Sequence, residues 1–92
     1  MNEIIPPNLI WACRRGMLEL DVLLGNFLRE AYAHLSPSEQ ALFVQLLSEN
    51  DQTLFEALTG KTLISVSELQ PMVLKVREHA KHRHSDPIIK TI

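Results

Sequence analysis

Apolar residues recur along most of the chain with the spacing of helices that bury one face. Between residues 17 and 35 they fall at every third or fourth position, and the same spacing returns after residues 38, 51 and 68. This period places apolar side chains on one stripe of an α-helix. The pattern predicts five helices: Leu9–Arg15, Met17–His34, one that begins after Ser36, one between Asp51 and Gly60, and one from Ser65 or Ser67 to Lys81.

Residues suited to helix starts separate these segments. Ser36 and Glu39 have the spacing of a capping box, and Pro37 occupies the first helical position between them. Asn8 is expected to cap the first helix, and Asp51 is expected to cap the fourth. The boundaries of three helices therefore rest on specific residues.

Glycine and proline mark the other boundaries. Gly16 is expected to end the first helix in a left-handed conformation, and Gly60 is expected to stop the fourth. Gly25 lies inside the second helix, where glycine costs about 1 kcal/mol against alanine, and is expected to permit a close helix crossing. Pro71 fits the fifth helix if Ser67 is the cap, because proline is tolerated only near a helix start. Residues 62–66 are β-branched but lack a partner strand, which predicts a packed loop.

These elements predict an all-α fold, a compact five-helix bundle that forms a single domain over residues 1–92. The ordered core is expected at about 8–81, with 82–92 as a flexible tail. A net charge of −2 gives no reason to expect nucleic acid as a partner. One cysteine cannot form an internal disulfide, no signal peptide is recognisable, and no apolar run approaches the roughly 20 residues that span a bilayer. We expect a cytoplasmic monomer that does not insert into membranes.

Two groups of side chains are candidates for chemistry. Cys13 has basic neighbours that would lower its thiol pKa, but its spacing from Leu9 favours a buried, apolar thiol. His79, His82 and His84 cluster near the end of the fifth helix. A metal site is conceivable there, but a solvated basic helix end is the simpler interpretation.

Rival functions remain open at this stage. The C-terminal region is basic, which allows a helical regulator that binds nucleic acid or resembles an antitoxin; its basic residues are Lys75, Arg77, Lys81, Arg83 and Lys90. Cys13 or the histidine cluster allows a small enzyme. Trp11 suits a binding anchor about as well as it suits core packing, because indole serves both purposes.

The junction between the first two helices carries charges of both signs. Arg15 and Glu19 oppose the dipoles of the two helices that meet there, and Gly16 turns the chain between them. A glycine junction leaves the backbone bare, so a cation, an anion and free amide groups are presented together. Met17 and Leu18 are expected to pack beneath it. The junction is therefore a candidate surface for a partner protein.

The run from Trp11 to Asp21 resembles the signature of the succinate dehydrogenase assembly factors, also called FAD assembly factors or flavinators. That family is marked by an Arg-Gly-x-x-Glu motif, which Arg15, Gly16 and Glu19 match here. The similarity continues in order to about residue 80. It includes Phe27, Tyr32, Leu35, the segment 36–39, Phe43, Leu46, Leu47, Asp51, Leu54 and Phe55.

The resemblance implies a five-helix, non-catalytic chaperone that binds the flavoprotein subunit of succinate dehydrogenase, and often of fumarate reductase. The factor promotes covalent attachment of FAD to a histidine of that subunit, so the FAD belongs to the client and the factor itself holds no cofactor. Arg15, Gly16 and Glu19 would lie on the docking surface, with Arg14 and Asp21 as further candidates. One departure is Ala57, where the family commonly has an aromatic residue.

Overall fold

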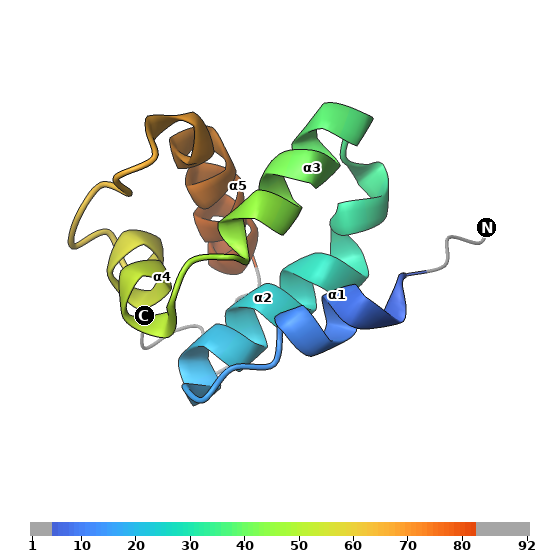
Figure 1. Ribbon diagram of the computed structural model, residues 1–92, viewed down its shortest axis with the longest axis horizontal. Helices are drawn as coiled ribbons and strands as arrows, with labels where there is room; N and C mark the ends of the chain where they lie inside the picture. The colour runs from blue at the N-terminus through green and yellow to red at the C-terminus, as the bar shows by residue number, and fades with distance from the viewer. Residues whose placement is uncertain (1–4, 83–92) are drawn as a thin grey trace.

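Every regular element of the described chain is helical. The structure is a computed structural model that describes residues 5–82. Five α-helices and two 3-10 turns follow one another, and the described residues contain no strand (Figure 1). Their bounds are α1 Pro7–Ala12, α2 Leu18–Glu30, η1 Tyr32–His34, α3 Pro37–Leu46, α4 Asp51–Leu58, η2 Ser67–Leu69 and α5 Gln70–Lys81. The predicted all-α, five-helix fold is confirmed, whereas most of the predicted tail lies outside the described residues.

Two helices begin at side-chain caps. The Ser36 hydroxyl accepts a hydrogen bond from the Glu39 amide at 3.2 Å, and the Glu39 carboxylate accepts one from the Ser36 amide at 2.9 Å. The predicted capping box of α3 is therefore confirmed. The prediction for α4 was one residue off, because Asn50 is the cap and accepts from the Thr53 amide at 2.8 Å. Asp51 is then the first helical residue, and its carboxylate does not cap the helix but accepts hydrogen bonds from Arg15 and Gly16.

Three other predicted boundaries were wrong. Helix α1 begins at Pro7 and ends at Ala12, so Asn8 lies inside it. Helix α2 ends at Glu30, and the chain continues through the separate turn η1. Ser67 does not cap α5: it starts η2, and Pro71 sits in the first turn of α5, where its missing amide is tolerated.

The core lies where α5 packs against α2, α3 and α4. Phe27 of α2 and Phe43 of α3 are both almost fully buried, with ring centroids 5.2 Å apart. Aliphatic side chains surround them, including Leu20, Leu24, Leu46, Leu54, Leu69 and Val76. Ala57 is buried as well, so the position where the family commonly has an aromatic residue faces the core of this protein.

The glycines of α2 and α4 have different surroundings. Gly60 follows α4 with a φ of +82°, the left-handed conformation that stops the helix as predicted. Gly25 does not permit a close crossing, because a Cβ added there would approach only the Arg29 Nη1 atom, at 3.4 Å. No atom of another helix lies within 4 Å of that Cβ, so the predicted reason for this glycine was wrong.

Candidate docking site at the corner between α1 and α2

The chain leaves α1 after Ala12 and enters α2 at Leu18 (Figure 1), and we call this junction with the helix ends that flank it, residues 11–21, the corner. Gly16 is exposed and has no positive φ, so the predicted left-handed turn is wrong. Its amide donates a hydrogen bond to the Asp51 carboxylate at 3.3 Å. A Cβ on Gly16 would make only an ordinary contact, 3.7 Å from that carboxylate. The glycine therefore keeps the surface of the corner low and is not forced by the backbone.

Arg15 points into the protein and ties the corner to the loop between α3 and α4. Its side chain is only 14% exposed. The guanidinium donates to the backbone oxygens of Leu47 and Glu49, the latter at 3.3 Å, and pairs with the Asp51 carboxylate at 3.3 Å. Because α1 ends at Ala12, Arg15 does not sit in its last turn as predicted. It acts as a clamp between two segments that lie more than thirty residues apart.

The other charged residues in and beside the motif differ in the hydrogen bonds and ion pairs that they make. Asp21 accepts a hydrogen bond from the backbone amide of Arg15, which holds Arg15 against the first turn of α2. Glu19, in the first turn of α2, is half-buried and makes no hydrogen bond or ion pair with a described residue. The exposed Arg14 side chain likewise has no carboxylate partner within residues 5–82. Among the described residues, Glu19 and Arg14 are thus the charged side chains of the corner that have neither a hydrogen-bond nor an ion-pair partner.

Two large apolar side chains of the corner are exposed to solvent. Trp11 is 73% exposed, which excludes core packing as its role. Leu18 is 61% exposed, so the expectation that it packs beneath the junction was wrong, whereas Met17 does pack against the core. A helix as short as α1 can bury only one face, which leaves Trp11 and Ile10 on its open side. Exposed aromatic and aliphatic side chains are typical of protein-binding surfaces.

Cys13 is a buried thiol, as predicted. It is 3% exposed and forms part of the core cluster. Burial raises the pKa of the thiol to about 11, although the positive charge of Arg15 opposes this shift. A thiol held in its neutral form is a poor nucleophile. The geometry therefore gives no support to a cysteine enzyme.

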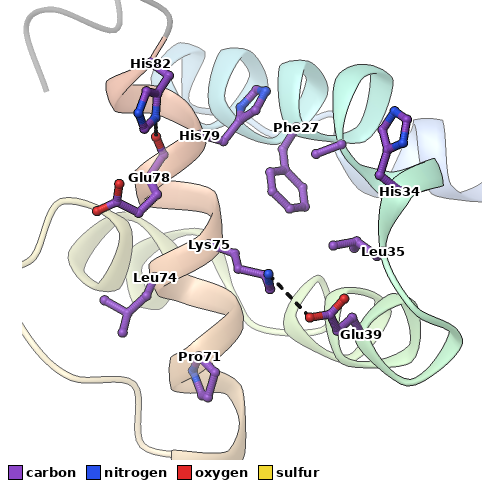
Figure 2. A pocket seen from close by; sticks show the side chains of 11 residues that line it. Phe27, His34, Leu35, Glu39, Pro71, Leu74, Lys75, Glu78, His79 and His82 are labelled. Atoms are coloured by element: carbon purple, nitrogen blue, oxygen red, sulfur yellow. Dashed lines mark hydrogen bonds and ion pairs between the residues drawn. The ribbon is translucent and has the colours of Figure 1, made fainter.

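A concave surface lies at the C-terminal end of α2, away from the corner. Figure 2 shows this groove of about 500 Å³, which lies between the end of α2, α3 and α5. Lys75 and Glu39 form an ion pair at 3.4 Å in this groove, and the His79 Nε2 atom lies within hydrogen-bond distance of the Glu30 carboxylate, at 2.9 Å. The charges of Lys75 and Glu39 thus offset each other within the groove.

The histidines near this groove make separate contacts. His79 packs edge-on against the Phe27 ring, whereas the His82 Nδ1 atom bonds to the backbone oxygen of Glu78 at 2.8 Å. His84 lies outside the described residues. Within residues 5–82, no three histidine, cysteine or acidic side chains are grouped closely enough to hold a metal ion. Likewise, no described helix is long and apolar enough to cross a bilayer.

Comparison with known proteins gives a consistent result. The family described as "Flavinator of succinate dehydrogenase" matches residues 8–80. Three relatives, each named FAD assembly factor SdhE, come from Coxiella burnetii, Shewanella oneidensis and Pseudomonas putida. They are 39%, 46% and 48% identical to this chain over 85%, 76% and 71% of its length, and over 96%, 85% and 77% of their own. This chain therefore belongs to the family of succinate dehydrogenase flavinators, the FAD assembly factors.

Proposed function

We propose that this protein is a non-catalytic chaperone that binds the flavoprotein subunit of succinate dehydrogenase and promotes covalent attachment of FAD to it. The FAD belongs to the client, and the protein has no cofactor of its own. Docking uses the corner, with Gly16 and Glu19 facing the client and Arg15 holding the corner in shape. Arg14 and Asp21 lie at its edge. The same surface serves the related subunit of fumarate reductase.

The observation that supports this proposal is that some residues of the corner are bonded internally while others are left unbonded at its surface. Arg15 and Asp21 make internal hydrogen bonds, so the corner is already rigid before a client arrives. The Glu19 carboxylate makes no hydrogen bond or ion pair within the described chain, and the Trp11 side chain is exposed to solvent. A rigid surface with an unpaired carboxylate and an exposed indole loses little conformational entropy on binding. This arrangement suits recognition of a protein surface.

Such a chaperone acts through differential affinity. It shifts the client toward the conformation that it binds more tightly, by an amount that equals the difference in binding free energy. If that conformation holds the client histidine against the flavin, attachment gains from proximity and orientation, since both reacting groups are fixed in place. The factor then needs no reactive group, which agrees with the neutral thiol of Cys13.

Co-expression of client and factor tests the proposal directly. Covalent flavin in the client, seen by its fluorescence in denaturing gels, is compared for wild type, Glu19→Ala and Gly16→Arg. Both variants should fold, because Glu19 has no internal partner among the described residues and Gly16 faces solvent. Glu68→Ala is the matched control, since Glu68 is also an acid near a helix start, on η2, and its side chain is exposed. We expect flavinylation to fall for the two corner variants and to persist for the control.

Full flavinylation with folded Glu19→Ala and Gly16→Arg would refute the corner as the docking surface. Arg15→Ala is less informative here, because it also removes the clamp to the α3–α4 loop. The proposal includes a cytoplasmic monomer. Size-exclusion chromatography with light scattering, together with cell fractionation, tests this part.

A further inference from the structure

Gly25 stands in the middle of α2 without a structural need for glycine. A helix interior is more stable with alanine at such a position, because glycine loses more backbone entropy on folding. The backbone has no positive φ there, and an added Cβ would meet only the tip of the flexible Arg29 side chain. What glycine does provide is open space above the helix.

That space is a cavity of about 180 Å³ between α1 and α2. The buried side chains of Cys13 and Leu28 line it, together with the half-buried Gly25 and with Ile10 of α1. Sites for cofactors and small molecules usually measure about 300 Å³ or more, whereas a cavity of about 150 Å³ holds one benzene ring. The size therefore fits a single large apolar side chain.

The charged residues around this cavity are mainly cationic. Arg14 and Arg29 both line it and are both exposed, which places them where it opens to solvent. The Arg29 guanidinium donates to the neutral side-chain amide of Asn26, and neither arginine pairs with a carboxylate in the described chain. The one carboxylate in the lining, that of Asp21, already accepts from the backbone of Arg15. The opening is therefore complementary to an acidic group.

We propose that this cavity is an anchor pocket, which receives one large apolar side chain of the client flavoprotein, with an acidic residue beside it at Arg14 and Arg29. The inference rests on the proposed function and refines it. Cys13 and Arg14 belong both to the cavity wall and to the corner, so the pocket and the docking surface are continuous. Gly25 is glycine because any side chain there would occupy the pocket.

Filling the pocket tests this directly. Gly25→Leu places a side chain in the cavity and also raises helix propensity, so the variant should melt at or above the wild-type temperature. The probe is the purified flavoprotein subunit of succinate dehydrogenase from the same organism, prepared without covalent flavin, and its Kd is measured by calorimetry. We expect Gly25→Leu to weaken binding about tenfold to a hundredfold, the loss of one buried anchor. Gly25→Ala should cause a smaller loss.

Ala41→Leu is the matched control, because it adds the same side chain to an exposed position of α3. If Gly25→Leu fails to fold, Ile10→Phe fills the same cavity from α1. Arg29→Gln should weaken binding by about two- to fivefold at low salt, the usual range for an exposed charge pair. Each variant is checked for helix content and melting temperature before its Kd is compared.

The outcomes separate the two proposals. Wild-type affinity in a folded, pocket-filled variant, together with lost affinity in Glu19→Ala, would refute the anchor pocket and leave the proposed function standing. Wild-type affinity in Ala41→Leu with weak binding by Gly25→Leu supports the pocket. If the wild-type protein does not bind the flavoprotein subunit at all, both the function and the pocket are refuted.

Discussion

Replacing Arg15 with alanine should destabilise the whole protein, although the residue belongs to a surface motif. Its guanidinium is largely buried and bonds to the backbone oxygens of Leu47 and Glu49 and to the Asp51 carboxylate. A hydrogen bond to a charged group contributes about 1.5–3 kcal/mol. Two of the contacts are long, at 3.3 Å, and Asp51 is partly exposed, so these add little.

We therefore expect Arg15→Ala to lower the free energy of unfolding by about 2–3 kcal/mol, mainly through the unsatisfied Leu47 carbonyl. For a chain of this size, that loss lowers the melting temperature by roughly 10–20 °C. Arg15→Lys should fall in between, because one ammonium group cannot reach three acceptors in a fixed fork geometry. The loss is a large part of the roughly 5–15 kcal/mol that stabilises a typical domain.

Urea denaturation followed by circular dichroism measures this difference, and calorimetry checks it. Arg14→Ala is the internal control, since Arg14 is the adjacent arginine but is exposed and lacks a carboxylate partner among the described residues. Its free energy of unfolding should stay within about 0.5 kcal/mol of the wild-type value. Equal midpoints for the Arg14 and Arg15 variants would show that the clamp contributes nothing to stability, and the assignment of Arg15 as a structural residue would fail.

Three further predictions follow from other contacts. A thiol reagent at neutral pH should label Cys13 at least a hundredfold more slowly than it labels the unfolded chain, since the pKa rises from 9.0 to about 11; fast labelling would contradict the burial. Hydrogen bonds from Ser36 and the charge of Lys75 lower the pKa of Glu39, so its stabilisation is complete above the ordinary carboxyl pKa and disappears as pH falls through the lowered value. The difference in denaturation midpoint between wild type and Glu39→Gln should thus be present at pH 7 and absent near about pH 2. Gly60→Ala should lower stability by about 1–2 kcal/mol because of its positive φ, whereas Gly16→Ala should leave the melting temperature nearly unchanged.

Local sequence signals were enough to predict the helices. The capping box of α3 and the stop at Gly60 depend on residues that are neighbours in the chain, and both are present as predicted. The end of α1 could not be predicted in this way. The chain leaves the helix at Ala12, and Arg15 beyond that end bonds to a loop more than thirty residues further on. No local pattern encodes that contact.

The composition of the candidate site was more predictable than its geometry. Sequence and family resemblance both pointed to Arg15, Gly16 and Glu19, but they treated the three residues as one exposed patch. The structure separates them, since Arg15 is turned inward while Gly16 is exposed. Trp11 shows the same limit: a six-residue helix has too few turns for its apolar period to tell which face is buried.

The bonds that Arg15 makes to the α3–α4 loop also bear on the order in which parts of the protein fold. The bonds from Arg15 to residues 47–51 close a loop of more than thirty residues, whereas the turns of α1 and α2 need only local contacts. Long-range closure loses more chain entropy, so it belongs to the later stages of folding. The corner therefore acquires its final shape only when both halves of the chain have joined. A nascent or partly unfolded chain lacks a finished corner, so under the docking site that we propose only molecules that have completed folding would bind the client.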